Sequence, residues 1–178
     1  MEKLMYQIKK SLCLVILSLF FSGSLLAMEH DPNDDLLKGR YYIKSKRFNL
    51  YMSVSYKEGD EKGIIKVYES VSSASVFIFE KNEEGILIMN PARKHYLYVA
   101  GPHRERGRIV DSYESIMSGS YFKILKKDQG NVIKNEKWHD YLHVANTLLK
   151  DNSRDVKYEE YIDENSYFIF EPCKQELF

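Results

Sequence analysis

Two histidines are the first residues whose spacing could support chemistry. His139 and His143 are four residues apart, which on an α-helix would let both side chains bind one zinc ion. The surrounding sequence instead predicts a strand, in which four residues span about 13 Å, too far for a single zinc ion. We therefore expect no metal site and no cofactor, and we interpret these histidines as solvated residues at strand ends.

Catalytic motifs are absent from the sequence. It contains no Gly-x-Ser-x-Gly, no glycine-rich phosphate loop and no Cys-x-x-Cys. Paired acids such as Glu83-Glu84 and Glu159-Glu160 have no positioned partner, which favours solvated charge over an acid–base pair. We expect the protein not to be an enzyme.

Basic side chains recur in and beside three predicted hairpin turns. Such turns are commonly polar because water solvates them. The alternative is an anion-facing surface on a chain whose overall charge is close to zero. The three basic groups are Lys44, Lys46 and Arg47, then Arg93, Lys94 and His95, then Lys134, Lys137 and His139, with His103, Arg104, Arg106 and Arg108 following the second group.

Trp138 is the only tryptophan and lies in the third of these turns. Counted from the preceding glycine, it aligns with Arg47 and Arg93, which predicts an exposed indole that could stack on a sugar ring or anchor a partner. The alternative is a ring that packs back onto the core. The candidate ligand-binding residues are therefore Lys46, Arg47, Arg93, Lys94, His95, Lys137, Trp138 and His139.

An internal repeat explains why these turns recur. Tyr51, Tyr96 and Tyr141 are 45 residues apart. A Ser-x-Phe pattern recurs at 75–79, 120–124 and 166–170, and Tyr68-Glu69-Ser70-Val71 matches Tyr113-Glu114-Ser115-Ile116, with Tyr158-Glu159 one period later. Such a period indicates one supersecondary unit that is repeated and buries its apolar side against its neighbours.

Apolar and polar residues alternate with a period of two through most of the chain from Gly39, which predicts strands. Residues 81–85 and 126–130 are matching turns that end on a glycine able to adopt a positive φ, and 59–63 is another hairpin turn. The segment 140–152 is the nearest to a helical pattern, but it aligns with a predicted strand. We expect an all-β fold with about four short strands in each of three repeats, the last strand, at 166–170, pairing with the first repeat.

On these repeats the chain resembles a β-trefoil of the ricin-B-like or growth-factor-like kind over residues 39–173. The resemblance implies a six-stranded barrel capped by three hairpins, with pseudo-threefold symmetry. It also implies a shared core built from Phe77, Phe122, Phe168, Leu97, Leu142 and Met52.

The resemblance does not extend to one trefoil family. Ricin-type lectins carry Gln-x-Trp in each repeat, whereas Glu136 stands two residues before Trp138, so their sugar-binding residues cannot be transferred. Fibroblast growth factors and interleukin-1-like cytokines remain possible relatives. Trefoil protease inhibitors usually carry disulfides, and fascin-type actin bundlers work in the cytoplasm, so neither fits this sequence.

The N-terminal residues are typical of a secretory signal peptide. Three lysines precede an uncharged apolar run at 11–26, which is short for a membrane anchor, and Ala27 offers a cleavage site. We predict a signal peptide at 1–27, an acidic lead-in at 28–38 and a β-trefoil domain at 39–178. Of the two cysteines, Cys13 would leave with the signal peptide, and Cys173 would be either buried or paired between molecules.

Removal of the signal peptide leaves 23 basic and 25 acidic residues, a net charge of −2. This balance argues against nucleic-acid binding. We expect a secreted, extracellular, monomeric binding module whose partner is a glycan or polyanion. The alternative is a cytokine-like, growth-factor-like or inhibitory ligand that docks on a protein receptor.

Overall fold

The computed structural model describes residues 39–56, 62–101 and 109–173. The predicted signal peptide, the acidic lead-in and the basic residues at 103–108 lie outside these ranges. No helix in the described ranges is long and apolar enough to cross a membrane.

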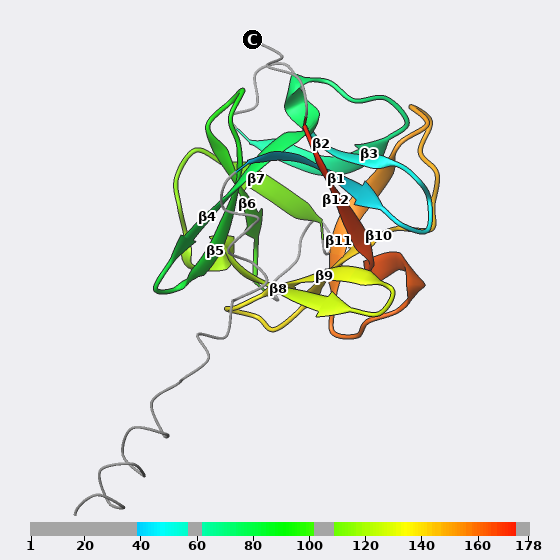
Figure 1. The fold of residues 1–178 in the computed structure, drawn as a ribbon. Coiled ribbons are helices and arrows are strands. Elements are labelled where there is room, and N and C mark those ends of the chain that lie inside the picture. Colours follow the sequence, from blue (N-terminus) through cyan, green and yellow to red (C-terminus); the bar gives the residue numbers. More distant parts are fainter. Residues whose placement is uncertain (1–38, 57–61, 102–108, 174–178) are drawn as a thin grey trace, which may run out of the picture. The chain divides into compact units, whose positions relative to one another are not determined.

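The described chain is all-β, and its helical structure is limited to three-residue 3-10 turns (Figure 1). These turns, η2 (Ser73–Ser75), η3 (Ser118–Ser120) and η4 (Glu164–Ser166), each lead into a strand. The twelve strands are β1 (Arg40–Ser45), β2 (Tyr51–Tyr56), β3 (Gly63–Tyr68), β4 (Val76–Asn82), β5 (Gly85–Asn90), β6 (His95–Val99), β7 (Val110–Tyr113), β8 (Tyr121–Lys127), β9 (Gly130–Asn135), β10 (Tyr141–Val144), β11 (Arg154–Glu159) and β12 (Phe168–Pro172).

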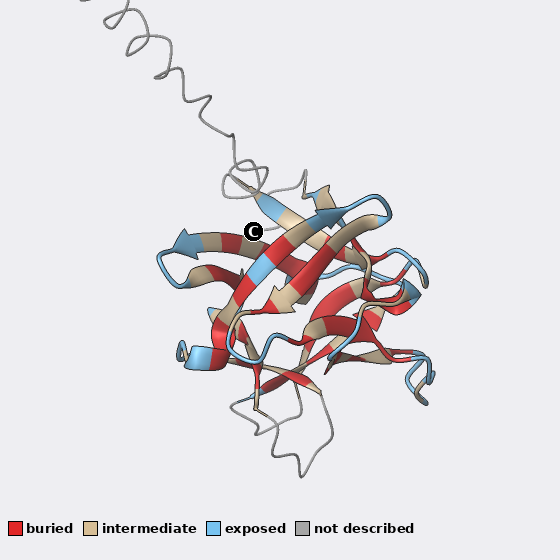
Figure 2. Cartoon of the chain, turned by 90° about the horizontal axis from the view of Figure 1, so that it is seen from below, coloured by how far each residue is buried: buried red, intermediate tan, exposed pale blue. Residues whose placement is uncertain are grey.

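The alternation in the sequence matches the faces of these strands. In β3, for example, every second residue is buried, and Figure 2 shows buried positions along the strands and exposed positions in the turns. The tight turns β4–β5 and β8–β9 end on Gly85 and Gly130, whose φ angles are 144° and 139°. The predicted positive φ at both glycines is confirmed, and a side chain at either position would be strained.

Six strands form a closed ring of antiparallel neighbours. β1 pairs with β4 and β12, β5 pairs with β4 and β8, and β9 pairs with β8 and β12. The predicted pairing of the last strand with the first repeat is confirmed, since Phe170 lies opposite Ile43. Because the ring closes, none of these six strands is a free sheet edge.

The other six strands form three hairpins: β2–β3, β6–β7 and β10–β11. β3 joins the hairpins to one another by pairing with both β7 and β11. Each hairpin follows one member of the ring, so similar strands recur: β1, β5 and β9 begin at residues 40, 85 and 130.

One alignment made from the sequence is wrong by a residue. Tyr51 pairs with Tyr68 and Tyr96 with Tyr113, but Tyr141 pairs with Glu159 and not with Tyr158. The connection from β10 to β11 is one residue longer than its counterparts, which moves Tyr158 to the inward face. Its side chain is 1% exposed.

The predicted core is confirmed. The six residues expected to share it are all fully buried in a single cluster: Met52, Phe77, Leu97, Phe122, Leu142 and Phe168. They come from all three repeats, so no repeat encloses its own apolar side chains.

Candidate ligand-binding site

The three basic turns share one backbone conformation. Each follows a ring strand and ends on a residue with a left-handed φ: Asn49 at 58°, Lys94 at 55° and His139 at 60°. These residues are 45 apart, so the position before them is occupied by Phe48, Arg93 and Trp138. The alignment of Trp138 with Arg47 is therefore wrong by one residue, because the count began at Gly39, which precedes β1.

A buried asparagine holds the third turn from below. Asn135 Nδ2 donates to the carbonyls of Gly119 and Tyr121, at 2.9 and 3.2 Å, and Asn135 Oδ1 accepts from the Trp138 amide at 3.0 Å. Asn90 does similar work in the second turn, where its Nδ2 donates to the Val76 carbonyl at 2.9 Å. These hydrogen bonds attach the second and third basic turns to the neighbouring 3-10 turns, η2 and η3, and to the strands that follow them.

In the first turn, the charge of Arg47 is already partnered. Its Nη1 donates to Asn165 Oδ1 at 2.7 Å and forms an ion pair with Glu164, both at the third repeat's 3-10 turn. Phe48 lies beneath the guanidinium of Arg154, with 4.2 Å from the ring centroid to Cζ. Lys46, the lysine of this turn, is exposed.

In the second turn, Arg93 and His95 meet on one ring. Arg93 Cζ lies 4.9 Å from the centroid of Tyr56, and the His95 ring lies 5.5 Å from it, edge to face. Burial lowers the pKa of His95 from its ordinary value, so the neutral imidazole is favoured there. Lys94 is exposed.

In the third turn, Trp138 is 36% exposed, and its six-membered ring lies over Gly101 of the second repeat. A Cβ atom built on Gly101 would lie 2.6 Å from Trp138 Cζ2, so only glycine leaves room for the indole. Lys137 Nζ lies 5.7 Å from the ring centroid, and His139 is exposed. The indole is exposed as predicted, but one side of it is used in packing between repeats.

Among the eight predicted site residues, Arg93 and His95 both contact Tyr56, and Lys137 lies beside Trp138. Each turn also packs on a different neighbouring repeat: Arg47 on the third, Arg93 on the first and Trp138 on the second.

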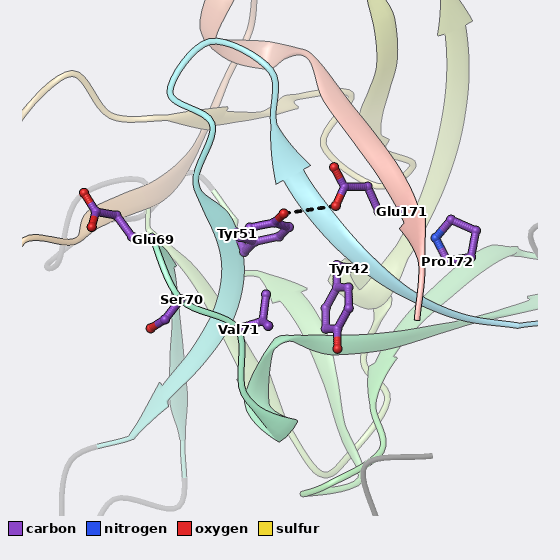
Figure 3. A pocket seen from close by; sticks show the side chains of 7 residues that line it. All are labelled: Tyr42, Tyr51, Glu69, Ser70, Val71, Glu171 and Pro172. Atoms are coloured by element: carbon purple, nitrogen blue, oxygen red, sulfur yellow. Dashed lines mark hydrogen bonds between the residues drawn. The ribbon is translucent and has the colours of Figure 1, made fainter. Parts of the chain in front are cut away.

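A pocket between β1, β2 and β12 was not predicted from the sequence (Figure 3). It is open to solvent and has a volume of about 530 Å³. Two tyrosine rings, two carboxylates, one hydroxyl and two apolar side chains line it: Tyr42, Tyr51, Glu69, Ser70, Val71, Glu171 and Pro172.

One wall of the pocket is a hydrogen-bonded group of three side chains. Tyr51 Oη donates to Glu171 Oε2 at 3.0 Å, and Lys44 Nζ lies 3.3 Å from Glu171 Oε1 and 4.8 Å from the Tyr51 ring centroid. The hydrogen bond with Tyr51 and the ion pair with Glu171 raise the pKa of Lys44, although partial desolvation opposes them. Lys44, which was expected to belong to a basic turn, instead holds the Glu171 carboxylate in position through this ion pair.

Tyr42 forms the neighbouring wall. Its ring meets that of Tyr51 edge to face, with 5.9 Å between centroids. Tyr42 Oη and Cys173 Sγ lie 3.3 Å apart and share a hydrogen bond that, with burial, raises the pKa of Tyr42 to about 12. Cys173 is half-buried against this phenol.

The pocket offers chemistry that the basic turns lack. Each carboxylate has lone pairs for further donors, and the Glu171 side chain is 38% exposed, so it can accept from a ligand as well as from Tyr51. The tyrosine rings and Val71, which is 42% exposed, provide apolar contact surface. Glu69 and Glu171 outnumber Lys44, so the pocket carries a net negative charge.

His143, the second residue of the histidine pair, is a buried residue of β10. Its Nδ1 lies 3.2 Å from Asp163 Oδ1, and its Nε2 lies 3.2 Å from Asn165 Nδ2. Both ring nitrogens therefore face protein groups. Within the described ranges, no three His, Cys, Asp or Glu side chains gather as metal ligands would.

No protein-family model matches the chain, and no curated protein sequence matches it. Solved structures do show the same fold at low sequence identity. A designed 3-fold symmetric protein, ThreeFoil, is 13% identical and superposes with a TM-score of 0.64 over 74% of this chain and 97% of its own.

Two further matches were solved with bound saccharides. The Polyporus squamosus lectin, bound to the epitope Neu5Aca2-6Galb1-4GlcNAc, is 17% identical, with a TM-score of 0.60 over 75% of this chain and 49% of its own. SeviL, bound to asialo-GM1 saccharide, is 12% identical, with a TM-score of 0.57 over 76% of this chain and 98% of its own. At these identities the matches show the fold alone, which is the threefold all-β fold of the trefoil type.

Proposed function

We propose that this protein is a secreted, non-enzymatic carbohydrate-binding module, a β-trefoil of three repeats with four strands each, and that the pocket at Tyr42, Tyr51 and Glu171 binds the sugar. One observation carries the proposal. The pocket places aromatic faces, a hydroxyl and hydrogen-bonding carboxylates around one open cavity, in a fold that lectins also use.

The geometry suits a saccharide because a sugar ring has two kinds of surface. Its C–H face packs on aromatic and apolar side chains, here Tyr42, Tyr51 and Val71. Its hydroxyl edge donates to carboxylates, here Glu69 and Glu171. A volume of about 530 Å³ is in the range of small-ligand pockets.

The charge of the pocket favours a neutral sugar. Glu171 is partly neutralised by Lys44, while the exposed Glu69 adds a further negative charge. An acidic sugar would place its carboxylate beside these groups, and like charges repel at this distance.

The basic turns are a second candidate surface, for an anionic glycan or another polyanion. Three exposed lysines support it, one from each repeat: Lys46, Lys94 and Lys137. Arg47 contributes less because Glu164 already neutralises it. Secretion is supported by the residues at 1–27, and a monomer is expected because the ring of strands closes within one chain.

Binding of the mature protein to a panel of neutral and sialylated saccharides tests the proposal. We expect neutral saccharides to bind, Glu171→Gln to weaken that binding about tenfold, and added salt to change it little. The matched control, Lys94→Ala, should leave it unchanged.

The opposite pattern would assign binding to the turns. In that case sialylated or sulfated glycans bind, binding falls steeply with salt, and Lys94→Ala weakens it while Glu171→Gln does not. Binding to no saccharide, with capture of an extracellular protein instead, would overturn the carbohydrate proposal and favour a protein ligand.

A further inference from the structure

The strand pairings show which residues take the places of the pocket residues in the other repeats. Glu171 of β12 lies opposite Tyr42 of β1, Glu80 of β4 lies opposite Leu87 of β5, and Leu125 of β8 lies opposite Val132 of β9. Tyr51, Tyr96 and Tyr141 begin or nearly begin the next strand in each case. The tyrosine is therefore present three times and the glutamate twice.

The second repeat reproduces the hydrogen bond of the pocket. Tyr96 bonds to Glu80 as Tyr51 bonds to Glu171. Burial, the charge of Glu80 and this hydrogen bond all raise the pKa of Tyr96. The two partners come from different strands, Glu80 from β4 and Tyr96 from β6, as Glu171 and Tyr51 come from β12 and β2.

The segment beside the tyrosine is also reproduced. Tyr68 and Tyr113 are paired with the two tyrosines, and the residues that follow them are Glu69-Ser70-Val71 and Glu114-Ser115-Ile116. Val71 and Ile116 are 42% and 45% exposed. An apolar side chain, a hydroxyl and a second carboxylate thus accompany both tyrosine–glutamate pairs.

The third repeat lacks the acceptor. Leu125 stands in place of the glutamate, and Lys134 Nζ lies 6.0 Å from the centroid of Tyr141. Tyr161 occupies the place of Ser70, one residue later than a period of 45 would put it. A sugar hydroxyl at Tyr141 would find no carboxylate from the neighbouring ring strand.

We propose that the second repeat holds a second neutral-saccharide site, built on Tyr96 and Glu80, and that the third repeat holds none. This inference rests on the proposed function. The second site is the weaker one, because Leu87 replaces the ring of Tyr42 and Met89 replaces Lys44, which leaves one aromatic wall and no lysine to orient the carboxylate.

Tyrosine-selective NMR of the mature protein can observe the three sites separately. The probes are neutral saccharides ending in galactose, mannose or N-acetylglucosamine. We expect the ring signals of Tyr51 and Tyr96 to shift, those of Tyr141 to stay, and the stoichiometry to be two saccharides per chain.

Three variants assign the sites. Glu80→Gln should remove the shift of Tyr96 and leave that of Tyr51, Glu171→Gln should do the reverse, and Leu125→Gln should change neither. The two glutamate variants should each weaken their own site about tenfold. Where Glu80→Gln lowers the melting temperature, Tyr96→Phe replaces it, since it removes the same bond without a change of charge. Its readout is the stoichiometry, which should fall from two saccharides to one while the signal of Tyr51 still shifts.

The outcomes separate the two proposals. Saturation at one saccharide, with Tyr51 shifted and Tyr96 unmoved, would overturn the second site and leave the proposed function standing. A shift of Tyr141 equal to that of Tyr96 would also overturn it, because the carboxylate would then be unnecessary. No shift at any tyrosine with any saccharide would overturn the proposed function as well.

Discussion

The basic turns and the pocket are both made of aromatic and charged side chains, but they use them differently. In the turns, Arg47, Arg93 and Trp138 each cover part of a neighbouring repeat. In the pocket, Tyr51 donates to Glu171 and packs edge to face on Tyr42, and these side chains still line an open cavity.

The difference shows that an aromatic or basic residue near a turn is not by itself a ligand contact. What distinguishes the two regions is what each side chain still has available. Arg47 is neutralised by its ion pair with Glu164, and one face of the Trp138 indole is covered by Gly101. In the pocket, by contrast, Glu171 still has lone pairs that can accept hydrogen bonds, and Val71 still has exposed apolar surface.

The largest effect is expected beneath a turn. Asn135→Ala removes three hydrogen bonds, including those to the Gly119 carbonyl and the Trp138 amide, so it should lower the free energy of unfolding by about 2–4 kcal/mol. Urea unfolding measures this. Asn131→Ala, on the same strand with one long bond of 3.4 Å, is the control, and an equal loss in both variants would contradict the anchoring role.

Trp138→Ala should have the next largest effect, because the half-covered indole packs on Gly101. We expect a loss of about 1–2 kcal/mol, less than the roughly 3–5 kcal/mol of a fully buried aromatic, and unchanged binding of neutral saccharides. Trp138→Phe should recover part of the loss. Retained stability with abolished saccharide binding would instead make Trp138 the ligand platform.

Gly101→Ala tests the same contact from the other side. The new Cβ would displace the indole, so the tryptophan emission should shift to longer wavelength as the ring becomes more hydrated. Unchanged emission would show that the indole does not depend on Gly101.

Glu171→Gln should cost less than about 1 kcal/mol of stability, because the glutamine can still accept from Tyr51 and the Glu171 side chain is 38% exposed, so that water and salt screen its ion pair with Lys44. Thermal unfolding at low and high salt measures this, and the difference between the proteins should shrink as salt is added. A loss as large as that of Asn135→Ala would mean that the pocket wall is structural and the distinction from the turns false.

The smallest effect is a titration. Tyr42 keeps its proton to about pH 12, above the ordinary phenol value of 10, so its contribution to stability is complete below pH 10 and is lost as the pH rises toward 12. Phenolate absorbance should show this late-titrating tyrosine, and Cys173→Ala should bring its midpoint down. An identical titration curve in that variant would exclude the Cys173 bond as the cause.

The repeat period is what made the fold predictable. Positions spaced by 45, such as Tyr51 and Tyr96, fall on strands, and the buried residues Phe77, Phe122 and Phe168 follow from the recurring Ser-x-Phe pattern. The period could not supply the pairing register. One extra residue before β11 placed Tyr158 in the core. Gly39 is 46 residues before Gly85, one more than the period, so counting from it aligned Trp138 with Arg47 and not with Phe48.

The pocket was not predictable in the same way. Its residues come from four separate segments, and Tyr42 is replaced by Leu87 and Val132 in the other repeats, so a search for repeated residues passes over it. Glu171 becomes a neighbour of Tyr51 only when β12 pairs with β1. A signal was present in the recurring Tyr and in Glu69-Ser70-Val71, but it gave no indication of a cavity.

Because β12 pairs with β1, the pocket can form only after both strands have been synthesised. Tyr51 precedes Glu171 by 120 residues, so a nascent chain that has not yet reached β12 has only half of the pocket. The second tyrosine–glutamate pair, Glu80 with Tyr96, is encoded within a short interior stretch. Removal of β12 would delete Glu171 and would also open the ring of strands and expose the shared core, to which Phe168 belongs. Assembly of the first pocket is therefore coupled to closure of the whole domain, whereas the Glu80–Tyr96 pair can form as soon as β4 to β6 have been made.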